Sequence, residues 1–372
     1  MKKIVIIGAN DFQNQLILKA KSLGYETHVF AWKDGSIGEK TADYFYPISI
    51  TEKEKILDEC KKIKPDGVCS IASDLAIITV NYVASKLGLP CNSIESNLQC
   101  TNKYVMRQKL RDANIKTPMF MKVGEKDKNI DVSKMHFPLI VKPTDRSGSR
   151  GITKIYSLDE LDDAVKTAIG FSFEKKAIIE EYIEGNEYSC ESISFQGKHY
   201  FLALTKKYTT GSPNFIETGH MEPSDIEEEK AKEIVREIHK ALDALEIKNG
   251  ASHAEFKLDD DGHFEIIEIG ARMGGDCIGS DLVQISTGYD FVKMVIDVSV
   301  GKQPDFTKVC TPATAIIKFI FTKEDLNEMN EYIKTHKDEI YRVSEMNLDN
   351  IGHTIDSSSR VGYYIIRKKD QL

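Results

Sequence analysis

The amino-acid sequence predicts an α/β protein that begins with a parallel, doubly wound sheet. Three observations support this class: apolar strand-like segments at Lys3–Ile7 and Gly67–Ala72, amphipathic helical stretches between them, and a later series of adjacent strands. Strands that alternate with helices form parallel sheets through right-handed crossovers. From about residue 101 the pattern changes, so a second unit is expected to follow the parallel sheet.

Length, charge and composition exclude several classes of protein. The 372 residues predict two or three domains, and the formal net charge of −8 disfavours a nucleic-acid or anionic-membrane partner. Apolar runs are too short for a spanning helix, and the first residues read as a strand instead of a signal peptide, so a cytoplasmic protein is expected. The seven cysteines lack paired spacing, so neither a disulfide framework nor a thiolate zinc site is predicted.

The ends of the first strands are where a doubly wound sheet places ligand groups. At Gly8–Gln13 only one of the three glycines of the dinucleotide fingerprint is present, so a tight turn is expected there instead of an NAD site. Ser73 and Asp74 follow a later strand at the same edge. They fit a ligand site, and Ser73 fits equally well as the N-cap of a helix over 75–87 that Gly88 ends.

Two lysines and a loop suggest a site for phosphate groups. Lys103 lies in the first turn of a helix capped by Thr101 or Asn102, where an unpaired cation opposes the helix dipole unless it serves a ligand. A buried strand ends in Lys142 and is followed by the loop Thr144–Gly151, which is rich in Gly, Ser and Arg. Such a loop can cradle a polyphosphate and close over it; the alternative is a solvated hairpin loop.

Cap and turn signals predict the remaining elements. Capping boxes that start at Ser157 and Ser224 predict two helices. Gln196-Gly197 is expected to form a hairpin turn. The other expected elements are strands at Tyr188–Phe195, Lys198–Leu204, Ala313–Phe321 and Val361–Ile366, and a helix at Lys323–His336.

Two glutamates are expected to face each other on a β-hairpin near residue 260. If Asp261-Gly262 forms a two-residue turn, Glu255 and Glu268 lie directly opposite each other on one sheet face. Like charges in this position destabilise a hairpin unless a positive group lies between them. A turn at Asp259–Gly262 would make the two glutamates diagonal neighbours, which still allows them to share an ion.

The rest of this hairpin supports a metal site. Alternation places Phe256 and Leu258 on the opposite face, together with Ile267 and Ile269. Carboxylates without a histidine pair favour Mg²⁺ or Mn²⁺ shared with substrate phosphates, and two exposed surface glutamates are the alternative. The glycine-dense loop that follows carries Arg272, a residue suited to gripping a phosphate or carboxylate.

Taken together, these segments resemble the ATP-grasp superfamily over nearly the whole chain. The sequences Glu268–Gly275 and Asp356–Tyr363 are most similar to the carbamoyl phosphate synthetase and L-amino acid ligase branch. The resemblance implies a Rossmann-like domain over residues 1–100 and an ATP-grasp domain over 101–310. It also implies a nucleotide-clamping lid at about 115–185 and a C-terminal α+β region over 311–372 that completes the substrate site.

The resemblance also implies roles for individual residues. Glu255 and Glu268 would bind magnesium, and Arg272 with Lys142 would act on the transferred phosphoryl group. Gly270 departs from the family pattern, which often has Asn there, so a metal would lose one ligand or recruit water or Asp276. The implied ATP contacts are the phosphate ligands Lys103 and Lys142, the flap residues Ser147, Gly148, Ser149 and Gly151, the adenine and hinge residues Glu180, Glu181 and Ile183, and Glu187 at the ribose.

The implied activity is that of an ATP-dependent carboxylate-amine ligase that forms an acyl phosphate, with ATP and Mg²⁺ (or Mn²⁺) as cofactors. Its partners would be small carboxylates and amines, Arg360 being a candidate anion contact, and base rates favour a homodimer. The alternatives are a glycinamide ribonucleotide synthetase-like enzyme, a carboxyphosphate-forming relative of biotin carboxylase, and a non-catalytic ATP-binding regulatory protein. An NAD-linked enzyme is a weaker alternative because of the poor glycine fingerprint.

Overall fold

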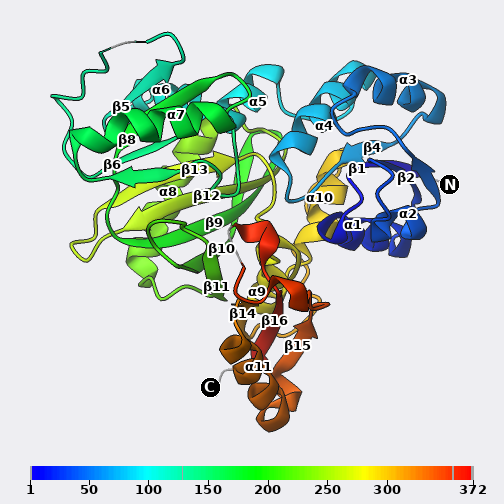
Figure 1. Ribbon diagram of the computed structural model, residues 1–372. Coiled ribbons are helices and arrows are strands. Elements are labelled where there is room, and N and C mark those ends of the chain that lie inside the picture. The colour runs from blue at the N-terminus through cyan, green and yellow to red at the C-terminus, as the bar shows by residue number, and fades with distance from the viewer. Residues whose placement is uncertain (1, 128, 354–355, 370–372) are drawn as a thin grey trace.

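A computed structural model describes residues 2–127, 129–353 and 356–369, and it contains three β-sheets (Figure 1). The N-terminal sheet has the order β3-β2-β1-β4 and is parallel, as predicted. Its strands are β1 (Lys3–Ile7), β2 (Glu26–Phe30), β3 (Tyr44–Tyr46) and β4 (Gly67–Cys69).

Helices cover both faces of this parallel sheet. Helices α3 (Lys53–Ile63) and α4 (Asp74–Leu87) pack on one face. The other face is covered by α1 (Asp11–Ser22) and by α10 (Phe291–Ser299), which comes from a distant part of the sequence. Because α10 closes this core, the N-terminal sheet is joined to the rest of the molecule by apolar packing. The remaining helices of this part of the chain are α2 (Ile37–Thr41), between β2 and β3, and α5 (Ile94–Thr101) and α6 (Lys103–Asp112), which follow α4.

A second, four-stranded antiparallel sheet forms the small unit at the upper left of Figure 1. Helix α7 (Leu161–Phe171) packs against it around a core of its own, and a 3₁₀ turn at Leu158–Glu160 precedes this helix. The strand order is β5 (Phe120–Gly124), β8 (Lys176–Glu181), β6 (Leu139–Pro143) and β7 (Thr153–Ile155).

The third sheet is antiparallel, has eight strands and carries most of the candidate site. Helix α8 (Glu228–Ala244) packs on it, and α11 (Lys323–Thr335) packs near its far end. The last three strands continue the same sheet, so the C-terminal region extends the central one. The order is β13 (Phe264–Gly270), β12 (Gly250–Leu258), β9 (Asn186–Phe195), β10 (Lys198–Thr209), β11 (Glu217–Glu222), β14 (Thr314–Ile320), β16 (Gly362–Lys368) and β15 (Ile340–Val343).

Short elements complete the chain between these strands. A π-helical turn at Ile278–Leu282 leads into α9 (Val283–Thr287) beside the site. Three 3₁₀ turns lie in the C-terminal region, at Lys337–Glu339, Leu348–Asn350 and Ser357–Ser359. Each of the seven cysteines is a free thiol. Among the described residues, no helix combines the length and the apolar character that crossing a membrane requires.

The cap predictions had mixed outcomes. Ser73 and Asn102 cap α4 and α6 through their side chains, as expected. The capping box at Ser157 is wrong, because its hydroxyl donates to the carboxylate of Glu160 and α7 begins only at Leu161. The box at Ser224 is also wrong: its backbone N–H is bonded to the Leu204 carbonyl, which ties it to β10, and α8 starts four residues later at Glu228.

Candidate active site

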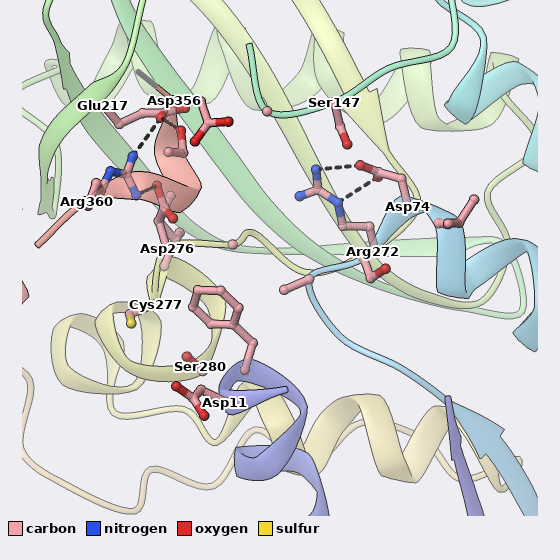
Figure 2. A pocket seen from close by; sticks show the side chains of 18 of the residues that line it. Asp11, Asp74, Ser147, Glu217, Arg272, Asp276, Cys277, Ser280, Asp356 and Arg360 are labelled. Carbon is pink, nitrogen blue, oxygen red and sulfur yellow. Dashed lines mark hydrogen bonds and ion pairs between the residues drawn. The ribbon is translucent and has the colours of Figure 1, made fainter. Parts of the chain in front are cut away.

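A cleft of about 1720 Å³ runs between the parallel sheet, the large sheet and the C-terminal strands. Its wall includes the first turns of α1 and α4, the loop 145–150, and side chains from β11, β12, β13 and β16. Figure 2 shows how residues far apart in the sequence, among them Asp11, Asp74, Arg272 and Arg360, meet around it.

Glu255 and Glu268 are direct partners across β12 and β13, as predicted. The two-residue turn at Asp261-Gly262 is wrong, whereas the alternative turn at Asp259–Gly262 is present, because the Gly262 N–H is bonded to the Asp259 carbonyl at 3.1 Å. The hairpin closes through a longer loop in which the Asp259 N–H binds the His263 carbonyl, and a β-bulge after Glu255 restores the pairing. The bulge also shifts the apolar face, so that Ile266, and not Ile267 as expected, is buried beside Phe256.

Cationic side chains relieve the like-charge contact between the two glutamates. The Lys103 ammonium lies 2.9 Å from the Glu268 carboxylate and 2.6 Å from the Arg146 carbonyl in the flap loop. The Lys207 ammonium lies 2.6 Å from the Glu255 carboxylate. In this structure the positive charge that the hairpin requires is therefore supplied by lysines.

Lys207 lies among three carboxylates at one end of the cleft. It was not predicted from the sequence as a site residue. Its buried ammonium lies 2.6 Å from Glu255, 3.0 Å from Glu187 and 3.9 Å from Glu217. Burial would lower the pKa of Lys207, but these carboxylates together raise it well above its usual value, so the side chain stays charged. Glu187, which was expected at a ribose, thus forms an ion pair in this structure.

A buried histidine supports Glu255 from behind. The His253 ring contacts Glu191 through Nδ1 and lies 3.1 Å from Glu255 through Nε2. Glu191 in turn accepts a hydrogen bond from the Gly274 N–H at 2.9 Å. Burial disfavours the charged imidazolium, but the two carboxylates raise the pKa of His253 to about 9. A charged His253 therefore holds the Glu255 carboxylate in place.

Lys142 and Glu180 lie together at the buried end of β6 and β8. The Lys142 ammonium is 2.5 Å from one Glu180 oxygen, and the Arg107 guanidinium is 2.5 Å from the other. Arg107 also donates to the carbonyls of Ile266 and Ile267 and so ties α6 to β13. Burial would raise the pKa of Glu180, but Arg107 and Lys142 hold it at about 2.

The segment after β8 carries the residues that were expected at the adenine and hinge. The Glu181 carboxylate accepts hydrogen bonds from the backbone N–H and the ring of His136, so this side chain points away from Glu180. The Ile183 N–H has no hydrogen-bond acceptor among the described residues. Between them, the Tyr182 ring lies 3.4 Å from the Lys154 ammonium and 4.1 Å from that of Lys257.

The flap loop reaches from β6 toward the large sheet. Ser147 and Gly148 line the cleft, and the Ser149 hydroxyl donates to the Phe215 carbonyl at 3.2 Å, between β10 and β11. Gly151 adopts a positive φ of +71°, and a Cβ there would lie 2.8 Å from the Phe171 ring. Only glycine therefore satisfies both the backbone and the packing at position 151.

Arg272 is paired with Asp74 from the N-terminal sheet. Its Nε and Nη2 atoms lie 2.7 and 3.2 Å from the two Asp74 carboxylate oxygens, as Figure 2 shows. The sequence suggested either a ligand site or a helix cap for Ser73 and Asp74. In the structure Ser73 caps α4, and Asp74 lines the cleft.

Arg360 lies at the other end of the cleft between two carboxylates. Its guanidinium is 2.8 Å from Glu217 and 2.9 Å from Asp276, and Figure 2 marks both contacts. The guanidinium also stacks over the Phe319 ring at 3.8 Å. Asp276, offered by the sequence as a substitute metal ligand, is therefore engaged by Arg360. Buried His220 lies 3.6 Å from Asp276, and within the described part of the chain neither of its ring nitrogens makes a hydrogen bond.

Comparison with known proteins agrees with this arrangement. Residues 135–281 match the family model described as the ATP-grasp domain. This segment of the chain is similar to an ATP-grasp domain. The matched part includes the flap loop, the hinge after β8, both hairpin glutamates and Arg272.

Relatives of this chain are named as ligases. The chain is 26% identical over 308 residues to alanine–anticapsin ligase of Bacillus subtilis strain 168, covering 73% of this chain and 65% of that protein. It is 26% identical over 278 residues to an L-arginine-specific L-amino acid ligase of Bacillus subtilis, covering 72% of this chain and 66% of that protein. The aligned regions thus span slightly less than two thirds of each relative.

Solved structures share the fold of this chain along its whole length. An L-amino acid ligase from Bacillus licheniformis superposes with a TM-score of 0.83 at 24% identity, over 100% of this chain and 94% of that chain. A phosphoribosylglycinamide synthetase from Anaerococcus prevotii gives a TM-score of 0.78 at 21% identity, over 100% and 95%.

Sequence reasoning missed several residues of the candidate site. Lys207 lies three residues beyond the predicted end of its strand, and β10 continues to Thr209. Arg107 follows Lys103 by one helical turn, and that i, i+4 spacing of two cations was an available signal. Glu191 and His253 carry no local signal, because they meet only through the pairing of β9 with β12.

Proposed function

We propose that this protein is an ATP-dependent carboxylate-amine ligase that activates a carboxylate as an acyl phosphate and releases ADP and phosphate. The observation that carries the proposal is the convergence of two facing glutamates with three cations in one cleft. Lys207 and Arg272 line the cleft together with Glu255 and Glu268. Lys207 contacts Glu255, and the Lys103 ammonium, from the start of α6, lies 2.9 Å from Glu268 at the wall of the cleft. This combination suits the transfer of a phosphoryl group, which needs charge neutralisation and positioning more than a nucleophilic side chain.

ATP would be held along the line from the hinge to the flap. The Ile183 N–H is available to the adenine edge, and Lys142 and Lys103 are available to phosphate oxygens once they exchange their carboxylate partners. Ser147, Gly148, Ser149 and Gly151 would cover the phosphates, and Glu187 would accept from the ribose. Closure of this loop keeps water from the reacting groups.

Glu255 and Glu268 are suited to hold magnesium. Both are hard oxygen donors at one site, and the lysines that now balance them show that the pair requires positive charge. When bound, magnesium would neutralise phosphate charge. His253 and Glu191 keep the Glu255 carboxylate oriented, and Lys103 links Glu268 to the flap loop.

Arg272 neutralises charge on the transferred phosphoryl group. No side chain in the cleft is assigned as a general base.

The far end of the cleft favours an amino acid over a ribosyl phosphate. Arg360 is matched by Glu217 and Asp276, and Arg342 is matched by Asp281 at 2.8 Å, so both guanidinium groups are already neutralised. A substrate phosphate would find no unpaired arginine at these two positions. An ammonium group, by contrast, would be attracted there, because Glu217 and Asp276 bring two negative charges to the one positive charge of Arg360. The names of the two ligase relatives agree with amino acids as substrates.

The test is release of ADP and phosphate from Mg-ATP in the presence of amino acids, singly and in pairs. Bicarbonate and a phosphorylated ribosylamine serve as separate arms. We expect ADP formation that depends on a particular acid and amine, together with a condensed product found by mass spectrometry. ADP formation only with the ribosylamine or with bicarbonate would replace this proposal with one of the other ligase classes. ATP binding without turnover in any arm would favour a regulatory role.

A further inference from the structure

Gly270 leaves room for a contact between two parts of the molecule. It lies two residues after Glu268, at the end of β13. A Cβ at this position would lie 3.1 Å from an Asp74 carboxylate oxygen and 3.2 Å from Nε of Arg272. A larger side chain would therefore occupy the space in which Asp74 and Arg272 meet. The geometry of the Asp74–Arg272 ion pair therefore depends on the absence of a side chain at position 270.

Asp74 is held where it can reach Arg272. It is the first residue of α4, where the helix dipole favours a carboxylate, and Ser73 before it caps the helix. The pair joins residues 198 positions apart in the sequence, and both side chains line the cleft. Burial would raise the pKa of Asp74, but Arg272, with smaller effects from Lys103 and His253, lowers it, so the carboxylate is charged.

The hydrogen bonds of Arg272 leave part of its guanidinium available. Asp74 accepts from Nε and from Nη2, and the Met273 carbonyl accepts from Nη1 at 3.2 Å. A guanidinium has five N–H groups, so one N–H remains on each terminal nitrogen. A two-point carboxylate contact fixes the plane of the guanidinium and therefore the direction of those remaining donors.

We infer that Asp74 is a positioning residue for Arg272, and that the parallel sheet thereby contributes to the phosphoryl-transfer site. Asp74 holds the guanidinium in one plane so that its two remaining N–H groups serve the transferred phosphoryl group. Glycine at 270 is the residue that makes this contact sterically possible. The catalytic consequence rests on the proposed function, whereas the contact itself is tested without any turnover.

The contact is tested by a thermal-unfolding cycle of Asp74→Ala, Gly270→Asn and the double variant. We expect Gly270→Asn alone to lower the melting temperature by several degrees, because its side chain collides with the ion pair. In the Asp74→Ala background the same change should cost less, since the nearer of the two groups is gone and Arg272 is no longer held in place by Asp74. Equal losses in both backgrounds would overturn the inference, whatever the activity of the protein is. Asp58→Ala, on the exposed face of α3, is the control background and should leave the full loss.

The positioning role is tested kinetically with the substrates found for the wild-type enzyme. We expect Asp74→Ala to lower kcat by about 10- to 100-fold, as for other residues that orient a ligand-binding side chain. The dissociation constant for ATP and the affinity for Mn²⁺ should stay unchanged, and Asp74→Asn should retain more activity than Asp74→Ala.

A comparison in the Arg272→Ala background shows whether Asp74 acts through Arg272. In that background, Asp74→Ala should cause no further loss of kcat. A full additional loss would show that Asp74 acts independently, and a weakened affinity for Mn²⁺ would show that it contacts the metal. Either result would overturn the positioning role.

Discussion

Arg107 and Glu180 form an ion pair whose side chains are almost wholly buried, with 2.5 Å between Nε and Oε1. The pair lies where α6, β8 and β13 meet, because Arg107 also donates to two carbonyls of β13. Lys142 completes the group on the other oxygen of Glu180. The candidate nucleotide site is therefore built around a charge network that also holds the fold together.

Replacement of Arg107 should destabilise the protein. Arg107→Met removes one of two cations from a buried carboxylate and leaves two strand carbonyls without a donor, which should cost about 3 kcal/mol of unfolding free energy. Urea denaturation measures this loss. Arg111→Met, one turn later on an exposed part of α6, is the matched control and should change the free energy by less than about 0.5 kcal/mol. Equal stability of the two variants would contradict the structural role.

Lys142 should contribute to ATP affinity. Lys142→Ala removes a buried ammonium from the end of β6, so the dissociation constant for ATP should rise at least about tenfold, the loss typical of a charged hydrogen bond. Isothermal titration calorimetry measures the constant, and Lys122→Ala, on β5, is the control. An unchanged affinity in a folded Lys142→Ala variant would reject a contact between this lysine and the phosphates.

Glu268 should be required for magnesium-dependent turnover. Glu268→Gln keeps the shape of the side chain but removes the charge, so ADP formation should fall roughly 100-fold and Mn²⁺ affinity should weaken. Electron paramagnetic resonance measures the bound Mn²⁺. Glu265→Gln is the control, because Glu265 lies on the same strand and pairs with Lys116 outside the cleft. Wild-type rates in Glu268→Gln would refute the metal assignment.

Glu222 should make the stability of the protein depend on pH. Burial raises the pKa of Glu222 to about 8, although hydroxyl groups of Thr205 and Ser286 donate to it. Because the folded value lies above the unfolded value, the folded protein holds the proton more tightly. Its stabilising effect is complete below the unfolded pKa and is lost as the pH rises toward 8.

Glu222→Gln should remove this dependence. Relative to the wild type, the variant should gain about 2 kcal/mol of unfolding free energy between pH 6 and pH 8, since each pKa unit corresponds to about 1.4 kcal/mol. Urea denaturation at the two pH values measures the change. Glu228→Gln, which alters an exposed residue of α8, should keep the wild-type dependence. A pH-independent difference for Glu222→Gln would contradict a protonated Glu222.

Local patterns in the sequence determined the secondary structure and part of the site. Alternation of apolar residues and turn signals led to the parallel sheet, the hairpin at Gln196-Gly197 and the end of α4 at Gly88. The pairing of Glu255 with Glu268 was also correct, although the two-residue turn was not. The bulge compensated for the longer loop, and a bulge depends on neighbouring strands as well as on the hairpin itself.

Only the tertiary structure decided which charges meet. Lys207 reaches three carboxylates from two other strands and from the start of β9, Asp74 reaches Arg272 across 198 positions, and α10 covers the parallel sheet. The sequence by itself determined strands, helices and their polar residues, because propensity, capping and periodicity act over a few residues. The ion pairs of the cleft depend on the order of strands and on packing between distant segments, which no local pattern encodes.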